Sequence, residues 1–255
     1  MPQIDTEGIS LRAIRYSETS QIVTLLTREA GMVRVMGKGT FKKRQGPLDL
    51  LQVYRILLIT KPSGALATLC EWECIDPLPG VRKTFEHLLA AWYKAEIAGF
   101  LAPEGEAFRV VYETVRDSLE DLDRGADPAT NTLLFAGRML GLSGYQPALD
   151  GCGTCGKPVP LRGTIHYEGG HLICRSCPKE NSQRYGGSAL ALVRSLLSSA
   201  AADSTSVRYP PHLVIRAQEF LDDQFREITE RDLRTVRYWK QWGSARGKAE
   251  RVKAL

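Results

Sequence analysis

The sequence lacks long apolar runs, and no stretch approaches the roughly 20 residues of a membrane-spanning helix. Its densest apolar segment, residues 133–142, is interrupted by Arg138 and two glycines. The first seven residues, MPQIDTE, carry neither the basic segment nor the apolar segment of a secretory leader. No internal repeat or low-complexity tract is visible. We therefore expect a non-secreted protein without a membrane segment, and 255 residues with 43% hydrophobic content predict one large or two to three small globular domains.

Cysteine is also scarce, with six residues in the chain, and four of them form two Cys-x-x-Cys pairs separated by eighteen residues: Cys152, Cys155, Cys174 and Cys177. Four soft ligands with this spacing are typical of tetrahedral zinc. A closed shell of four sulfurs leaves the metal no open position for an activated water. The pattern therefore predicts one structural Zn²⁺ per chain. Cys70 and Cys74 lie in a strand-like run and are expected to be small buried residues.

Two other interpretations of the cysteines fit the sequence less well. Disulfides of a secreted protein are disfavoured because no leader is visible. His166, Glu168 and the second cysteine pair imitate the signature of zinc deaminases. Only five residues separate Glu168 from Cys174, too few for the helix and strand that this site needs, and the first pair would have no role. His171 is expected to be a loop residue.

The fold class that we predict is α+β with several domains. Five short strands between Gly8 and Cys74 suit a small closed barrel such as the OB-fold, although an SH3-like barrel would give a similar pattern. Beyond Pro77–Gly80 the apolar period changes to that of helices, which are interrupted by a zinc knuckle. Thr229–Asp232 resembles a capping box that starts a last helix ending near Trp242. The expected parts are a barrel, a first helical part, the knuckle, a second helical part and a basic tail: 1–79, 80–148, 149–178, 179–242 and 243–255.

Acidic residues are absent between Glu29 and Asp49, although the net charge of the whole chain is only +5. This segment holds several cations, and Phe41 offers a stacking surface for an unpaired base. Lys61 is expected in the turn between strands 4 and 5, at the same mouth of an OB-fold. A basic run can also be merely a solvated loop, but its place on the ligand side of an OB-fold favours nucleic-acid binding. The candidate residues of this region are Arg34, Lys38, Phe41, Lys42, Lys43, Arg44 and Lys61.

A second basic stretch, residues 226–253, contains Arg231 and Arg234 close to Tyr238 and Trp239. It either extends a DNA path or keeps a terminal helix soluble, and the sequence favours neither. Arg231 and Arg234 are therefore further candidates for DNA binding. Residues 104–127 are rich in acids and should repel DNA.

Residues 144–156, GYQPALDGCGTCG, and 169–177, GGHLICRSC, resemble the central motif of the RecO family of bacterial recombination mediators. Leu25–Thr27, Gly31 and Gly37–Gly39 with the basic residues after them resemble the same family. The resemblance extends from the barrel to the last helix.

The resemblance implies an N-terminal OB-fold, a helical domain with a zinc knuckle, and a non-enzymatic cytoplasmic protein associated with the nucleoid. It implies binding of single- and double-stranded DNA, annealing of complementary strands, and loading of RecA, together with RecR, onto DNA coated by single-strand-binding protein. The protein is expected to be a monomer on its own. A zinc-stabilised scaffold for protein interactions, without annealing activity, is the alternative; a zinc-dependent nucleic-acid enzyme is disfavoured by the closed four-sulfur site.

Overall fold

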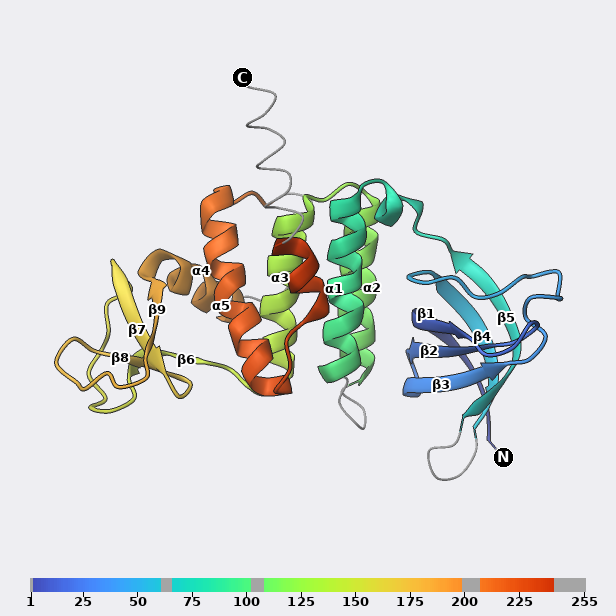
Figure 1. Ribbon diagram of the computed structural model, residues 1–255, viewed down its shortest axis with the longest axis horizontal. Coiled ribbons are helices and arrows are strands. Elements are labelled where there is room, and N and C mark those ends of the chain that lie inside the picture. Colours follow the sequence, from blue (N-terminus) through green and yellow to red (C-terminus); the bar gives the residue numbers. More distant parts are fainter. Residues whose placement is uncertain (1, 61–65, 102–107, 199–206, 241–255) are drawn as a thin grey trace, which may run out of the picture. The chain divides into compact units, whose positions relative to one another are not determined.

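The computed structural model describes residues 2–60, 66–101, 108–198 and 207–240. The chain divides into two compact units, residues 1–126 and 127–255 (Figure 1). Among the described residues, the first unit holds the predicted barrel, a short 3₁₀ helix and two α-helices, and the second holds three α-helices, a helical segment at 234–240 and the cysteine-rich segment. The finer division into five parts stays a prediction.

The first unit begins with a closed five-stranded barrel in the order β1-β2-β3-β5-β4. Its strands are β1 (Gln3–Arg15), β2 (Gln21–Thr27), β3 (Gly31–Gly37), β4 (Val53–Ile59) and β5 (Ala67–Asp76). The long first strand pairs with β4 along its first half and with β2 along its second, and a short parallel pairing of β3 with β5 closes the ring. This order is that of an OB-fold, as predicted. Alternate side chains fill the interior, among them Val23, Leu25, Val35, Ile56 and Trp72.

Strand β1 contains a bulge between Ser10 and Arg12. Before the bulge the even-numbered residues face the interior, since Ile4 packs on the core and Ser10 pairs with the inward-facing Leu25. After the bulge Ala13 faces the interior and Arg12 faces outward. Regular alternation therefore does not extend across residues 9–13, because the extra residue reverses the strand's faces.

The rest of the first unit is a short 3₁₀ helix, η1 (Pro79–Arg82), followed by α1 (Phe85–Leu101) and α2 (Phe108–Asp123). Helix α2 packs on β2 and β3. Gly80 lies against the end of α2, where its N–H donates to the Oδ1 of Asp123 at 2.5 Å. A Cβ at position 80 would approach the carbonyl oxygen of Asp123 to 2.3 Å, so only glycine fits this contact.

The second unit contains α3 (Pro128–Leu142), α4 (Gly187–Ser198) and α5 (Pro211–Thr229), with residues 234–240 also helical. As predicted, α3 begins after Asp127, whose carboxylate accepts the N–H of Thr130 at 2.8 Å. The predicted capping box is wrong: α5 continues through Thr229, whose hydroxyl donates to Phe225 O, and the next helical residue is Arg234. No helix in the described ranges has the length and apolar character needed to cross a bilayer.

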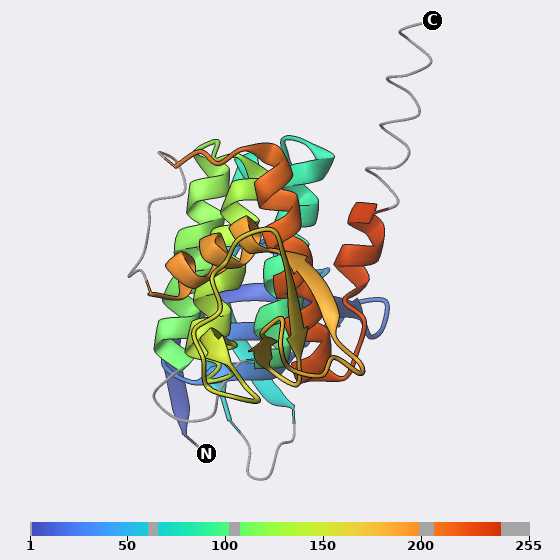
Figure 2. The same ribbon diagram turned by 90° about the vertical axis from the view of Figure 1, so that its left-hand side faces the viewer.

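Between α3 and α4 lies a four-stranded sheet that the sequence interpretation did not foresee. Its strands are β6 (Ala148–Cys152), β7 (Thr164–Glu168), β8 (His171–Ile173) and β9 (Gln183–Gly186), in the order β6-β8-β7-β9 (Figures 1 and 2). Tyr167 and Tyr185 meet Phe220 of α5 edge to face, with ring centroids 5.1 and 4.9 Å away. The sheet thus rests on α5 through aromatic contacts that do not involve the cysteines.

Candidate metal centre and nucleic-acid interface

The four paired cysteines form one cluster. Their sulfurs all lie within 4.8 Å of one another, although the two pairs are eighteen residues apart in the chain. The parallel pairing of β6 with β8 places Cys152 opposite Leu172, so that the turns after these two strands face each other. The N–H of Gly153 donates to Leu172 O at 2.9 Å and secures this approach. A Cβ on Gly153 would lie 2.6 Å from that of His171.

The cluster has the dimensions of a tetrahedral zinc site. Zinc–sulfur bonds of about 2.3 Å place the sulfurs of a tetrahedron about 3.8 Å apart. Cys155 Sγ and Cys174 Sγ are separated by 3.7 Å. In the described part of the chain the group contains cysteines alone. His166 instead meets Ser182 Oγ at 2.8 Å, and Glu168 accepts the N–H of Asn181, so the deaminase arrangement is not assembled.

Cys152, Cys174 and Cys177 have shifted pKa values, and the shifts differ in direction. The N–H of Cys174 donates to Cys152 Sγ at 3.4 Å, which stabilises the thiolate and lowers the pKa of Cys152 to about 6. A backbone hydrogen bond from Ser176 lowers the pKa of Cys174. Hydrogen bonds with the sulfurs of Cys174 and Cys155 raise the pKa of Cys177 to about 12. Backbone N–H groups thus favour thiolates here, the form that binds a soft cation.

Lys179 supports the second cysteine pair. Its ammonium group donates to the carbonyl oxygens of Arg175 at 2.8 Å and of Cys177 at 3.1 Å. These bonds fix the turn that carries Cys174 and Cys177. They also bring a positive charge close to thiolates that would carry a net negative charge around a metal.

The basic segment of the barrel is exposed in the structure. Arg34 faces outward from β3, and the exposed residues Lys38, Phe41, Lys42, Lys43 and Arg44 follow that strand. The loop is held in place because the N–H of Phe41 donates to Thr19 O at 3.1 Å, and that of Gly39 to Ser20 Oγ at 3.2 Å. The basic loop therefore lies beside the β1–β2 turn. Lys61 lies outside the described residues.

Sequence reasoning missed the residues that β1 contributes to this surface. The guanidinium of Arg15 lies 4.9 Å from the centre of the Phe41 ring and donates to the carbonyls of Ser17 and Glu18. Lys43 lies 4.6 Å from the ring centre of Trp72, a cation–π contact with a buried side chain. The sequence shows only that Arg12 and Arg15 are basic. Which side chains they contact depends on the strand register, which the sequence does not give.

Arg231 and Arg234 belong to the second compact unit, whereas the barrel cations belong to the first. Arg231 follows α5, and Arg234 is the first residue of the helical segment 234–240. The contact of both residues with DNA stays a prediction. The predicted tail, residues 243–255, lies outside the described residues.

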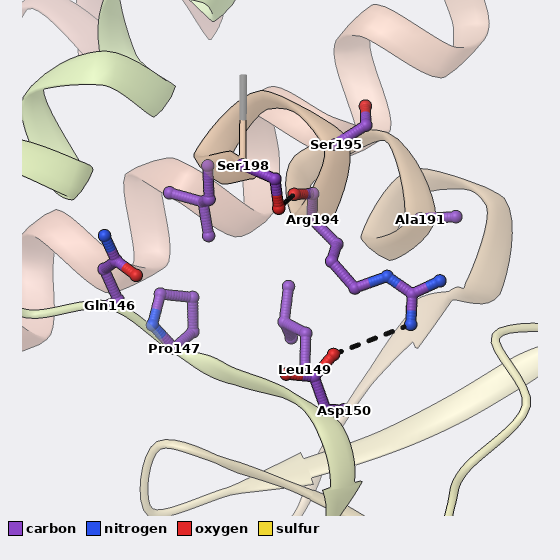
Figure 3. A pocket seen from close by; sticks show the side chains of 9 residues that line it. Gln146, Pro147, Leu149, Asp150, Ala191, Arg194, Ser195 and Ser198 are labelled. Carbon is purple, nitrogen blue, oxygen red and sulfur yellow. Dashed lines mark hydrogen bonds and ion pairs between the residues drawn. The ribbon is translucent and has the colours of Figure 1, made fainter. Parts of the chain in front are cut away.

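The second unit also contains a hollow of about 400 Å³ between α4 and the chain leading into β6 (Figure 3). Buried Pro147 and Leu149 line one side, and Ala191 and Leu197 of α4 line the other. Arg194 reaches over the hollow to Asp150, with which it forms an ion pair at 3.8 Å. The lining thus mixes apolar side chains with the polar residues Gln146, Ser195 and Ser198, and Arg194 lies at its rim.

Comparison with known proteins places this fold in a family. A family model described as "Recombination protein O N terminal" matches residues 1–78, and one described as "Recombination protein O C terminal" matches residues 82–237. The chain belongs to the RecO family. Membership in the RecO family supports a role of this protein in DNA repair, as the resemblance implied.

Individual RecO proteins align over most of the chain. The "DNA repair protein RecO" of Rhodopirellula baltica is 32% identical over 199 residues, which cover 75% of this chain and 74% of that protein. The Bacillus subtilis protein of the same name is 34% identical over 183 residues, or 70% of each chain. The Geobacter metallireducens protein is 27% identical over 247 residues, covering 94% of this chain and 98% of its own.

Proposed function

We propose that this protein is a recombination mediator that binds single- and double-stranded DNA and anneals complementary strands. The observation that carries the proposal is the exposed set of cations on the β3 side of an OB-fold barrel in a RecO family member. Arg34, Lys38, Lys42, Lys43 and Arg44 would contact phosphates, and Phe41 would contact bases. Lys61, Arg231 and Arg234 complete the proposed set.

Annealing requires two strands to approach with their charges screened and their base edges free to pair. Cations on the barrel provide the screening, and contacts to phosphates and base faces leave the pairing edges accessible. No catalytic residue is proposed, because neither strand undergoes a covalent change. If four or five phosphates are neutralised, the logarithm of affinity for a single strand should fall with the logarithm of salt concentration at a slope of about −3.

We propose that the cysteine cluster holds one Zn²⁺, through Cys152, Cys155, Cys174 and Cys177. The spacing of the sulfurs and the N–H groups directed at them support this assignment. Bound zinc would cross-link β6 and β8 and would leave no position for a water molecule. Its proposed role is therefore to stabilise the sheet.

The proposed partners are RecR, single-strand-binding protein and, indirectly, RecA, and the proposed location is the cytoplasm, at the nucleoid, as a monomer. The hollow at Arg194 offers four apolar side chains and a cation at its rim, and these are the groups that we propose bind the acidic, hydrophobic tail of single-strand-binding protein. Because the ion pair of Arg194 with Asp150 is exposed, it contributes little and an incoming carboxylate can replace it. Arg194→Ala should weaken binding of a tail peptide, whereas Arg216→Ala on α5 should not.

The decisive experiment measures how fast the protein anneals two complementary oligonucleotides coated with single-strand-binding protein. We expect acceleration that declines as salt rises. Replacing Lys42, Lys43 and Arg44 together by alanine should abolish most of it. A charge-matched control replaces three exposed cations of the second unit, Lys157, Arg162 and Arg184, by alanine and should retain annealing.

The outcomes separate the candidate functions. Equal losses in both triple variants would show that overall charge, and not the barrel loop, determines annealing. A protein that binds RecR but shows no salt-dependent affinity for any oligonucleotide would instead be the zinc-stabilised scaffold.

A further inference from the structure

The outer face of the barrel carries an apolar row that crosses three strands. In the register of β1, β2 and β3, Ile14 lies opposite Ile22, and Ile22 lies opposite Met36. Residues directly opposite in antiparallel strands project from the same face. Val23 and Val35 point into the core, so the row faces outward. Ile14 is 45% exposed, and Ile22 and Met36 are partly exposed.

A cationic row runs parallel to the apolar one. Arg12 lies opposite Thr24, and Thr24 lies opposite Arg34. Each of these residues lies two positions along its strand from the residue of the apolar row. That step is about 7 Å. Within the described residues neither arginine has an ion-pair partner, and both are exposed. On the other side of the apolar row β3 ends in Gly37 and is followed by Lys38, so cations flank the row on both sides.

The bulge in β1 creates this arrangement. Without it, Arg12 and Ile14 would continue the even-numbered series that faces the barrel interior. The extra residue turns both side chains outward, in line with those of β2 and β3. Bulges commonly re-aim side chains in this way next to functional sites.

Helix α2 ends the open part of the face. The next outward pair, Leu26 with Met32, lies where α2 packs on β2 and β3, and Leu26 is fully buried. Arg28 and Arg109 are paired with Glu113 of α2 there, at 3.7 and 3.6 Å. The acids of α2 outnumber its bases by five to two, so this helix opposes a polyanion beyond the open face.

We propose that the row Ile14–Ile22–Met36 is a platform on which unpaired bases lie, while Arg12 and Arg34 hold their phosphates. The inference rests on the proposed function and makes it specific, because it selects single strands. A duplex keeps its base faces stacked and can offer the row only phosphates and sugars. The flanking cations identify the occupant as a polyanion, and the apolar row requires that its bases be exposed.

The test compares three ligands by fluorescence anisotropy at fixed salt: a thymidine oligonucleotide, an abasic phosphodiester chain of the same length, and a duplex. A length of about 20 nucleotides exceeds the roughly 4–16 nucleotides that one OB-fold covers. The platform variant carries Ile14→Thr and Met36→Gln, and its matched control carries Ile75→Thr on β5, where the isoleucine is 38% exposed. The cation variant carries Arg12→Gln and Arg34→Gln, with Arg55→Gln on β4 as control. Circular dichroism checks that each variant is folded.

We expect the unmodified protein to bind the thymidine oligonucleotide at least about fivefold more tightly than the abasic chain, which corresponds to burial of about 40 Å² of base surface on the apolar row. The platform variant should lose most of this preference, with Phe41 accounting for the remainder, while its affinity for the abasic chain stays unchanged. The cation variant should bind both ligands more weakly by a similar factor. It should also reduce the slope of the logarithm of affinity against the logarithm of salt concentration by about 1.4.

A platform variant that keeps the full preference for thymidine would overturn the inference and leave the proposed function standing. Absence of salt-dependent binding to all three ligands would overturn the proposed function and this inference together.

Discussion

Removing the proposed zinc should open one edge of the small sheet and leave the other edge folded. Strand β6 is joined to β8 by two register pairs, Ala148 with His171 and Cys152 with Leu172, and a bulge or irregularity separates them. Strands β7 and β9 are joined by four pairs and also hold Tyr167 and Tyr185 against α5. The proposed zinc would therefore provide most of the attachment of β6 and little of that of β7 and β9.

The size of the effect follows from this division. A structural zinc typically contributes on the order of 10 kcal/mol to the segment it binds. The backbone hydrogen bonds that remain at the β6 edge contribute about 1 kcal/mol each, less than the entropy of ordering the two turns. The apo segment should thus open locally. The amide exchange rates of Gly153 and Cys174 should rise by at least about 100-fold, equivalent to about 2.7 kcal/mol of local stability.

Hydrogen exchange measured with zinc bound and after chelation tests this expectation. Cys155→Ser should reproduce the effect of chelation, because Cys155 is exposed and its loss removes a ligand without opening a cavity. Cys74→Ser, which changes an exposed cysteine of the barrel, is the matched control. The reasoning is refuted if Gly153 and Cys174 stay protected without metal, or if Ile165 and Tyr185 lose protection to the same extent.

Two further substitutions have defined consequences. Lys179→Met should release zinc to a colorimetric chelator about 10–100 times faster, because the carbonyl of Cys177 loses its hydrogen-bond donor. Lys179→Arg should restore much of the difference. Equal release rates would show that the lysine does not affect zinc binding. Arg116→Met should lower stability by about 1–3 kcal/mol, since Glu7 of β1 loses the arginine of α2 that pairs with it while remaining three-quarters buried. At roughly 2–4 °C per kcal/mol the melting temperature of the first unit should fall by several degrees, and an unchanged value in differential scanning calorimetry would contradict this account.

The cysteine cluster was predictable because its information is local. Two residues separate the cysteines of each pair, Cys152 from Cys155 and Cys174 from Cys177. Two such pairs in one chain are typical of a metal site and of few other structures. The helices were predictable for a similar reason, since their apolar period is regular and Asp127–Pro128 marks the start of α3. The four-stranded sheet was missed because its strands are of three to five residues, too short to show a period.

Lys94 shows a different limit of sequence reasoning. It lies in the middle of α1, fully buried, and donates to Ala90 O at 3.2 Å. Burial lowers the pKa of its ammonium group well below the ordinary value. A lysine in a helix is expected on the solvated face. Its burial follows from tertiary packing, which the pattern of α1 does not contain.

The barrel surface depends on register, and register depends on one extra residue. The basic loop is visible in the sequence because Lys42, Lys43 and Arg44 are consecutive. Arg12 and Arg34 are twenty-two positions apart, and they share a row because β2 pairs with both of their strands and because the bulge in β1 reverses that strand's faces. A regular strand would place Arg12 in the barrel interior, where an unpaired guanidinium is costly. The bulge thus exposes a cation that a regular strand would bury, which explains how the barrel can keep its apolar core and present two arginines and an apolar row on one outer face.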